Sequence, residues 1–353
     1  MKKIVIHGAT WTDNFGDTLF FEVFGNKIIN LGYEPILVKA DNNLVKQLSF
    51  NIKNYQNLNE ALQEASAIVY VGGGYFGEAP NISRIRRLLW SIKLYLKCYR
   101  LGVLTAQKKK PMIILGVGAG PVHINFIKKT ILKICNSSMT VVVRDVESQE
   151  FLSMLGVSEK KLLTTADTLI AVDSIFPESG SRKNIILVHL QDVPDNSKKV
   201  RSIVEQLDKF ILKFPTYSVI GIGDQVGNPG QDAWLEYCSI HFGTKSIKYT
   251  NPRKLIHDLA KGEIVITEKL HVGIISASYN NSVYSLPRHD KTKRFYKQIG
   301  YAERVITDNE LFSEGLLSKM IKFKSTPIEV PTFIKDGSKL NLDILTNFLD
   351  ELK

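Results

Sequence analysis

Short apolar runs alternate with helical patterns along almost the whole chain, and this alternation constrains the fold more than any other feature. Each run is rich in Ile and Val and is closed by Gly, Asp or a charged residue, which is typical of a buried strand. The first predicted strands are residues 3–7, 35–39, 67–71, 112–116 and 140–143. The helices predicted with them are residues 17–31, 58–65, 83–106, 125–135 and 146–155. This succession predicts a parallel sheet with helices on both faces.

A polar segment, residues 173–184, interrupts the rhythm, and a second series follows it. Its predicted strands are residues 185–189, 218–222, 246–249, 264–267 and 283–286. Its predicted helices are residues 198–214, 232–241, 252–260, 271–279 and 291–299. We therefore predict two Rossmann-like doubly wound α/β domains, residues 1–175 and 184–325. Residues 326–353 form a C-terminal extension, whose predicted helix at 340–352 we expect to pack on the first domain.

The positive charge of the chain is concentrated in one segment. The net charge is +11, which by itself suggests a polyanionic partner. Residues 79–144, however, carry thirteen Lys and Arg and no acidic residue, while the rest of the chain holds 33 bases and 35 acids. The sequence also lacks a recognised nucleic-acid-binding motif, so we expect no nucleic-acid partner.

The predicted helix at 83–106 lies in this basic segment and is apolar on two sides. A stripe at helical spacing is predicted to pack on the domain, and its members are Ile85, Leu88, Leu89, Ile92, Leu96, Tyr99 and Val103. The opposite side is predicted to be an exposed ridge of Trp90, Leu94 and Leu101, flanked by Arg86, Lys93, Lys97 and Arg100 on one edge and by Arg87 on the other. An apolar ridge between bases predicts docking on anionic lipid, although a second domain or a partner chain could cover the same side.

Cysteine usage and the N-terminal residues indicate a cytoplasmic protein. Cys98, Cys135 and Cys238 lie far apart and have no metal-type spacing, which fits a reducing compartment. The apolar run that follows Met1 is too short for a signal peptide, and no run reaches the ~18 residues of a membrane span. The motifs of metal, P-loop and dinucleotide sites are absent, so we expect neither a metal ion nor a cofactor.

Polar and glycine-rich turns follow the predicted strands of the first domain. Ligands of doubly wound sheets lie at the carboxyl ends of strands, so these turns are candidate binding segments. The first turn ends in Asn14, Gly16 and Asp17, which can place an anion at a helix N-terminus or form a plain helix entry. Two later turns contain Gly73 and Gly74, and Gly118 and Gly120, whose backbone N–H groups can cradle phosphate or carboxylate.

Charged residues concentrate at two further strand ends. Arg144 follows the fifth strand and can clamp a carboxylate or phosphate, or form a solvated pair with Asp145. In the second domain one strand leads into Thr267-Glu268-Lys269-Leu270-His271, and His271 is a candidate general acid or base. A cationic group follows, comprising Arg288, His289, Lys291, Lys293 and Arg294, which can complete an anion site or form a solvated helix face.

Six motifs occur in an order and spacing that resembles the polysaccharide pyruvyl transferase family. They are Asn14-Phe15-Gly16-Asp17, Val71-Gly72-Gly73-Gly74, Gly116-Val117-Gly118-Ala119-Gly120-Pro121, Val143-Arg144-Asp145 with Ser148 and Leu155-Gly156, Ala166-Asp167, and Thr267-Glu268-Lys269-Leu270-His271. One departure is Lys269, which stands where the family usually has Arg. Lysine keeps the charge but lacks the planar fork of arginine.

The resemblance implies two Rossmann-like domains that face a cleft, as in the GT-B glycosyltransferases. It also implies transfer of the enolpyruvyl group of phosphoenolpyruvate onto two hydroxyls of one sugar, which forms a cyclic pyruvate ketal and releases phosphate. Many glycan precursors of exopolysaccharides and capsules are built on a polyprenyl carrier. We therefore expect a polyprenyl-linked sugar acceptor and a peripheral location on the inner face of the cell membrane.

Each candidate residue can be given a role in such a reaction. His271 is the expected acid and base, and Asp17 or Glu268 is the second proton-transfer group. Arg144 and Lys269 are expected to bind the donor anions, with Lys291 and Arg294 as further cations. Asn14, Gly16 and the four glycines Gly73, Gly74, Gly118 and Gly120 are expected to position sugar or phosphate. Two alternatives remain, a GT-B glycosyltransferase that uses a nucleotide sugar and a non-catalytic glycan-binding protein.

Overall fold

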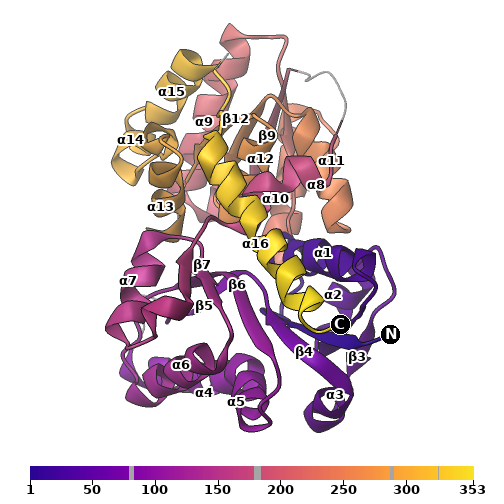
Figure 1. Ribbon diagram of the computed structural model, residues 1–353. Helices are drawn as coiled ribbons and strands as arrows, with labels where there is room; N and C mark the ends of the chain where they lie inside the picture. Colours follow the sequence, from indigo (N-terminus) through magenta and orange to yellow (C-terminus); the bar gives the residue numbers. More distant parts are fainter. Residues whose placement is uncertain (79–82, 179–183, 287–289, 325) are drawn as a thin grey trace. The chain divides into compact units, whose positions relative to one another are not determined.

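The computed structural model describes the whole chain except residues 79–82, 179–183, 287–289 and 325 (Figure 1). The chain forms two compact units. We call Met1–Asp13, Asp17–Thr168 and Phe333–Lys353 the N-terminal unit. We call Asn14–Gly16 and Leu169–Thr332 the C-terminal unit. Each unit contains its own parallel sheet, as the alternating pattern predicts.

The N-terminal unit is built on an eight-stranded sheet whose paired strands are all parallel. The strands are β1 (Lys3–His7), β2 (Glu34–Val38), β3 (Lys53–Tyr55), β4 (Ala65–Tyr70), β5 (Gly73–Phe76), β6 (Met112–Ala119), β7 (Val141–Val143) and β8 (Leu162–Thr164). Their order is β3-β2-β1-β4-β6-β7-β8, and β5 also pairs with β6. Strands β4, β6 and β7 are buried along nearly their whole length, because their Ile and Val side chains meet helices on both faces.

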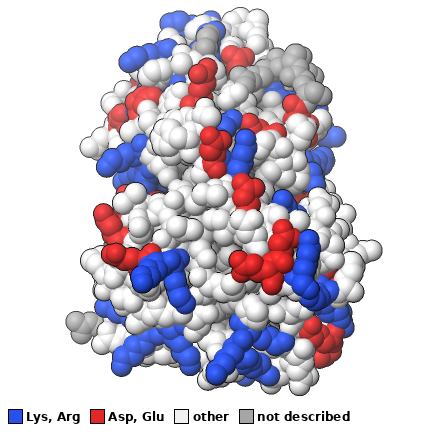
Figure 2. Space-filling view, in the orientation of Figure 1, with Lys and Arg blue, Asp and Glu red and all other residues white. Residues whose placement is uncertain are grey.

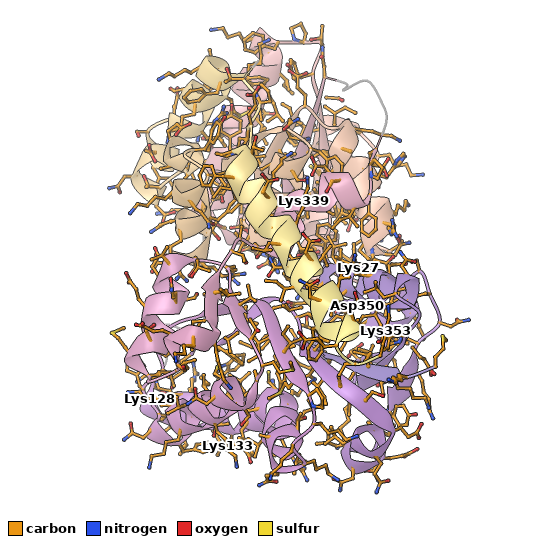
Figure 3. The ribbon with its side chains drawn as sticks, viewed as in Figure 1. Lys27, Lys128, Lys133, Lys339, Asp350 and Lys353 are labelled. Atoms are coloured by element: carbon orange, nitrogen blue, oxygen red, sulfur yellow. The ribbon has the colours of Figure 1, made fainter. Side chains whose placement is uncertain are left out.

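The N-terminal unit also contains helices (Figure 1). They are α1 (Phe15–Asn30), α2 (Asn42–Gln47), α3 (Leu58–Glu64), α4 (Arg84–Leu94), α5 (Arg100–Gln107), α6 (Asn125–Ser137), α7 (Val146–Met154) and the C-terminal α16 (Thr332–Asp350). Helix α16 packs on this unit as expected. Its Ser338 hydroxyl donates to the Thr168 carbonyl at 2.8 Å, and its Asn341 amide donates to the Ala166 carbonyl at 3.0 Å. Beyond its last turn Lys353 pairs with Asp350 at 2.8 Å (Figure 3).

The C-terminal unit contains a four-stranded parallel sheet. Its strands, β9 (Ile185–His189), β10 (Ser218–Gly221), β11 (Ile264–Thr267) and β12 (Ser282–Ser285), follow the order β10-β9-β11-β12. Its helices are α8 (Val172–Ile175), α9 (Lys198–Lys213), α10 (Pro229–Phe242), α11 (Pro252–Lys261), α12 (Leu270–Ser278), α13 (Asp290–Gln298), α14 (Asp308–Phe312) and α15 (Gly315–Phe323). Helices α10 and α11 begin with an Asn N-cap followed by Pro, a residue whose fixed φ suits the first helical turn.

The chain passes from the first unit to the second at Thr168, ahead of the polar segment at 173–184. The residues directly after Thr168 are apolar and buried, from Leu169 to Val172. They lead into α8, where the Asp173 N–H donates to the Ser278 hydroxyl of α12 at 3.1 Å. Core packing thus assigns this short stretch to the second unit.

The predicted strand at 246–249 is wrong. Among the described residues this segment forms a single parallel bridge, between Ile247 and Ile222. The Ser246 N–H donates to the Ser239 hydroxyl at 3.2 Å, and the Ser246 hydroxyl donates to the Leu235 carbonyl at 2.7 Å. Bonds to α10 therefore replace part of the hydrogen-bond ladder that a strand would need.

The predicted helix at 83–106 is interrupted. Helix α4 ends at Leu94, a π-helical turn spans Tyr95–Tyr99, and α5 begins at Arg100. A π-turn has more residues per turn than an α-helix, so a regular projection misplaces every residue after it. In this turn the Cys98 carbonyl points toward the sheet. It accepts hydrogen bonds from the Tyr70 hydroxyl and the His7 Nε2, both at 2.9 Å. Burial lowers the pKa of His7 to about 4, so the neutral imidazole makes this bond.

The predicted orientation of this helix is also wrong. Leu94 and Leu101 were predicted to be exposed with Trp90, but they are 5% and 3% exposed. The stripe predicted to pack inward is instead largely exposed, and its exposed members are Ile85, Leu88, Leu89, Ile92 and Leu96. A helix with apolar residues on two sides does not reveal which side will meet the sheet, because that depends on the surface it packs against.

Figure 2 shows Lys and Arg side chains along the lower edge of the view, over α4 to α6. Across the described ranges, none of the helices is long and apolar enough to cross a membrane.

Candidate functional site

The carboxyl ends of three neighbouring strands in the C-terminal unit bring a buried polar cluster together. His189 is the last residue of β9, and Asp224 lies just beyond β10. The His189 Nε2 lies 3.1 Å from the Asp224 Oδ1, to which the Gln231 amide of α10 also donates. The Gln231 carbonyl oxygen accepts the Asp224 N–H at 2.9 Å. Asp224 is thus held by both its side chain and its backbone.

The Asp224 carboxylate anchors Lys269, which lies at the end of β11. The two groups are 3.6 Å apart, between Nζ and Oδ2. Burial acts to raise the pKa of Asp224, but the charge of His189, its hydrogen bond and the charge of Lys269 outweigh burial and hold that pKa well below its usual value. Asp224 therefore stays ionised at neutral pH and fixes the Lys269 ammonium at the strand ends.

The turn from β11 into α12 orders Glu268 and His271. The Thr267 hydroxyl accepts the Lys269 N–H at 2.9 Å, which closes the turn. The buried Glu268 carboxylate accepts the Gln191 N–H at 3.0 Å. His271 lies half-buried in the first turn of α12. This short segment thus holds a carboxylate, an ammonium and an imidazole in fixed places.

Residues Asn14–Gly16 pack against this turn and explain the Asn-Phe-Gly-Asp motif. The Phe15 N–H donates to the Asp224 carbonyl at 2.7 Å, and the buried Phe15 ring lies 6.2 Å from the Tyr249 ring. A Cβ on Gly16 would lie 1.9 Å from the His271 Nδ1. Glycine at this position is therefore what lets the imidazole approach the backbone.

Gly16→Ala is expected to displace the His271 ring. The added methyl group overpacks the contact, which costs about 1–3 kcal/mol of folding stability. The change is measured as shifted imidazole resonances of His271 in NMR spectra, together with a lower denaturation midpoint. The control is Gly337→Ala in α16, where the new Cβ meets its nearest atoms at 3.6 Å, an ordinary contact. Unchanged His271 resonances in Gly16→Ala would contradict the packing described here.

In the N-terminal unit Arg144 lies at the end of β7 and is 6% exposed. Its Nη1 lies 3.0 Å from the Asp167 Oδ2, and its Nε lies 3.8 Å from the Asp145 Oδ2. A Cβ on Gly118 would lie 2.7 Å from the Arg144 Nη2, so Gly118 leaves room for the guanidinium. A Cβ on Gly74 of β5 would also lie nearest to Nη2, at 3.9 Å. Arg144 is a buried, oriented cation and not the solvated pair with Asp145 that the sequence left open.

Asp145 and Ser148 fix the backbone that carries Arg144. Asp145 caps α7, and its carboxylate accepts the Ser148 N–H at 2.8 Å. The Ser148 hydroxyl in turn accepts the Ala119 N–H at 2.9 Å and donates to the Ala119 carbonyl at 3.1 Å. These bonds join the start of α7 to the end of β6. The spacing from Arg144 to Ser148 is therefore a structural requirement of the Arg144 position.

Gly73, Gly74 and Gly118 lie in strands, although the sequence predicted turns, and Gly120 lies one residue beyond β6. Gly73 and Gly74 belong to β5, and β6 continues through Gly118 to Ala119. Gly73 has a positive φ of 119°, which side chains rarely adopt. The Gly120 N–H donates to the Phe76 carbonyl at 3.2 Å, so a backbone partner already occupies it. Gly118 thus has a packing role, because it leaves room for the Arg144 guanidinium.

The other predicted residues are distributed over both units. Asp17 lies in the first turn of α1 in the N-terminal unit, near enough to Tyr75 for its charge to add to the effect of burial in raising the pKa of Tyr75. Lys291 and Arg294 lie on α13, which follows β12. Arg288 and His289 are outside the described residues. Two clusters therefore carry most of the predicted site residues, one around Arg144 and one around His271.

Several partners of these clusters were missed as site residues in the sequence. His189 and Gln231 hold Asp224, and Asp167 pairs with Arg144. Their position in the sequence could have indicated them, because His189 ends a predicted strand and Asp224 follows another. Asp167 was indicated only by its family motif, since β8, the strand that precedes it, is too short to be recognised from its sequence.

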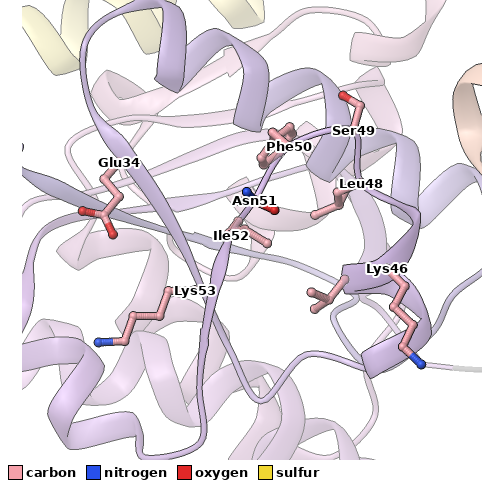
Figure 4. Close-up of a pocket in the computed structure, with 9 residues that line it drawn as sticks. Glu34, Lys46, Leu48, Ser49, Phe50, Asn51, Ile52 and Lys53 are labelled. Carbon is pink, nitrogen blue, oxygen red and sulfur yellow. The ribbon is translucent and has the colours of Figure 1, made fainter.

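A cavity of about 640 Å³ lies elsewhere in the N-terminal unit (Figure 4). Its walls come from the segment around α2 and β3, and they include Lys46, Phe50 and Lys53. The predicted site residues do not line it, so it gives no support to their assignment. Within the described ranges, no three His, Cys, Asp or Glu residues are grouped in a way that could hold a metal ion.

A family model covers most of the chain. The model described as polysaccharide pyruvyl transferase matches residues 14–290, which include both clusters. A search of curated proteins found no match.

Solved structures share the fold at low sequence identity. S. aureus MnaA, solved with UDP, is 12% identical with a TM-score of 0.64, covering 99% of this chain and 96% of that chain. UDP-GlcNAc 2-epimerase from Neisseria meningitidis, bound to UDP-GlcNAc, is 11% identical with a TM-score of 0.60, covering 98% of this chain and 100% of that chain. UDP-GlcNAc 2-epimerase from Methanocaldococcus jannaschii is 13% identical with a TM-score of 0.63, covering 98% of this chain and 100% of that chain. The chain thus has a GT-B-like fold.

Proposed function

The chain belongs to the polysaccharide pyruvyl transferase family, and we propose that it transfers the enolpyruvyl group of phosphoenolpyruvate onto two hydroxyls of one sugar. The product is a cyclic pyruvate ketal, and phosphate is released. The observation that carries the proposal is the Gly16–His271 contact beside the Asp224–Lys269 pair, within the part of the chain that matches the family. That arrangement supplies a titratable imidazole next to a fixed cation.

The proposed reaction balances without a cofactor. Protonation of the methylene carbon of phosphoenolpyruvate makes it a methyl group and leaves an oxocarbenium-like carbon beside the carboxylate. One sugar hydroxyl adds to that carbon and loses its proton, the C–O bond to phosphate breaks, and the second hydroxyl adds. Of the two hydroxyl protons, one balances the proton placed on carbon and the other leaves with phosphate. The reaction therefore needs a group that gives and takes protons, and cations that hold two anionic groups.

The cluster around His271 supports the proton-transfer part of the proposal. His271 would protonate the methylene carbon and accept a hydroxyl proton, because an imidazole can act as both general acid and general base. Glu268 is the nearer candidate in sequence for the second proton-transfer group, and Asp17 is the other. Lys269 would bind a donor anion, held in place by the ionised Asp224. Asn14, Lys291 and Arg294 would contact phosphate or sugar.

The cluster around Arg144 supports donor binding. The planar guanidinium can hold a carboxylate or phosphate with two parallel hydrogen bonds. Asp167 would orient it, and the absence of a side chain on Gly74 and Gly118 would leave space beside it. We propose that the acceptor is a polyprenyl-linked sugar of an exopolysaccharide or capsule precursor.

The proposal is tested with phosphoenolpyruvate and a panel of polyprenyl-pyrophosphate-linked sugars. Phosphate release and the mass gain of a ketal on the sugar are expected together. In D₂O the new methyl group should gain one deuterium, and an ¹⁸O label at the bridging oxygen should appear in phosphate. Phosphate that lacks the label would indicate P–O cleavage and contradict the mechanism.

A second candidate is sugar transfer from a nucleotide sugar. It is favoured by the fold of the solved structures, two of which contain UDP or UDP-GlcNAc. Thermal stabilisation by UDP, with none by phosphoenolpyruvate, would support it. Stoichiometric glycan binding without turnover of either donor would instead support a glycan-binding protein, for which the change from Arg to Lys at 269 is the motivation.

A further inference from the structure

Helix α4 and the π-turn carry a large apolar stripe that faces solvent. Ile85 and Leu89 are 75% and 62% exposed, and Leu88, Ile92 and Leu96 are also exposed. Their spacing of three or four residues places them on one side of the helix. The other side already packs on the unit through Leu94, Cys98 and Tyr99. The exposed stripe is therefore additional to the face that the fold needs.

The neighbouring helix α6 extends this surface. Phe126 is exposed at the start of α6, and its ring lies 5.2 Å from the Tyr95 ring of the π-turn. Lys133 lies further along α6, and Lys128 lies two residues after Phe126 (Figure 3). We use the name α4 face for the surface formed by Ile85, Leu88, Leu89, Ile92, Leu96 and Phe126 with the exposed bases around them. Those bases are Arg86, Lys93, Lys97, Arg100, Lys129 and Lys133.

The charge on the α4 face is of one sign. No acidic residue occurs between Glu78 and Asp145 in the sequence. Glu78, the acidic residue that precedes this segment, forms an ion pair with Arg87 at 3.2 Å. Trp90 borders the stripe, with the Lys93 ammonium 5.8 Å from the centre of its ring. Aliphatic side chains at the centre, bases around them and a tryptophan at the margin match the layers of a lipid surface, from acyl chains to head groups.

We propose that the α4 face docks on the interfacial region of a bilayer that contains anionic lipids. The aliphatic stripe would enter the boundary between head groups and acyl chains, and the bases would contact lipid phosphates. A second copy of the chain fits the face less well, because two such surfaces would bring like charges together. A nucleic acid would bind the bases but would leave the branched aliphatic side chains without stacked partners.

Sedimentation with vesicles tests the proposal and does not depend on the proposed reaction. The full chain is mixed with vesicles of equal parts phosphatidylglycerol and phosphatidylcholine, and with vesicles of phosphatidylcholine alone. Binding is expected only to the anionic vesicles and should weaken as salt is raised, because salt screens the bases. Absence of binding to anionic vesicles at low salt would overturn the proposal.

Two double variants separate the apolar from the charged contribution. Leu89→Ser/Ile92→Ser and Lys93→Glu/Lys97→Glu are each expected to lower the apparent vesicle affinity at least tenfold. The matched controls are Leu212→Ser/Ile240→Ser and Lys198→Glu/Arg201→Glu, which change exposed residues of the C-terminal unit. These controls should bind like the unmodified chain. The substituted side chains are all exposed, so denaturation midpoints should stay the same.

Specific results would contradict membrane docking. Loss of binding in the charge variant but not in the serine variant would mean that only electrostatics act, and would exclude insertion. A concentration-dependent dimer that the serine variant abolishes, without vesicle binding, would assign the α4 face to self-association. Equal effects of the control variants would show that the location of the residues does not matter, which also overturns the proposal.

Discussion

His271→Gln is expected to lower kcat/KM for ketal formation by about 10²- to 10⁴-fold, the usual contribution of a positioned acid or base. Glutamine keeps hydrogen-bonding capacity and similar bulk but does not titrate near neutral pH. His271 is only half-buried in the first turn of α12, so the replacement should not disturb the fold. The measurement is phosphate release from phosphoenolpyruvate with a polyprenyl-linked sugar, together with the denaturation midpoint.

The control for this prediction is His241→Gln. His241 lies on α10 and pairs with Asp208 of α9 at 3.0 Å, outside the strand-end cluster. Its replacement should leave kcat/KM unchanged. If His271→Gln retained kcat/KM within threefold of the unmodified chain, His271 would not be the acid or base.

Arg144→Met is expected to destabilise the protein by about 3–5 kcal/mol, because it leaves the buried Asp167 carboxylate without its partner. The Asp167 side chain is 4% exposed, and the Arg144 Nη1 lies 3.0 Å from it. Methionine fills much of the space of the arginine stem, so the loss of charge pairing is the main effect. The measurement is the free energy of unfolding from urea denaturation.

The double variant Arg144→Met/Asp167→Asn separates stability from binding. Removing both charges should recover most of the lost stability, since the Asp167 charge is then no longer buried without Arg144. Binding of phosphoenolpyruvate should not recover, because the guanidinium is still absent. A double variant as unstable as the single one would contradict the pairing, and normal affinity for phosphoenolpyruvate would contradict the role of Arg144 in binding.

Much of the fold could be predicted because strand and helix patterns are local. Strands β1, β9 and β11 have the predicted bounds, since each is an Ile- and Val-rich run with a clear end. Strand β5 was missed because its glycines resemble a turn and because its pairing with β6 involves residues far apart in sequence. The segment 246–249 has a strand-like composition, but side chains of α10 compete for its backbone groups.

The candidate site was predicted as a set of strand ends, and the structure arranges those ends into two clusters. The sequence indicated His271, Lys269 and Arg144 because they follow predicted strands, and ligands of doubly wound sheets lie at the carboxyl ends of strands. It did not indicate that Gly16 lies against His271, or that Asp167 lies against Arg144. Such contacts depend on where distant segments meet.

The sequence by itself determined the α/β class, most of the elements and the turns that carry the polar residues, because periodicity and turn chemistry act within a few residues. Only the tertiary structure decided which side of α4 faces solvent and which carboxylate holds each cation. A helix with two apolar sides is oriented by the surface it packs on, and a π-turn at Tyr95–Tyr99 changes the register of the residues that follow. Asp224 and Asp167 reach Lys269 and Arg144 because parallel strands bring their carboxyl ends to one edge of each sheet.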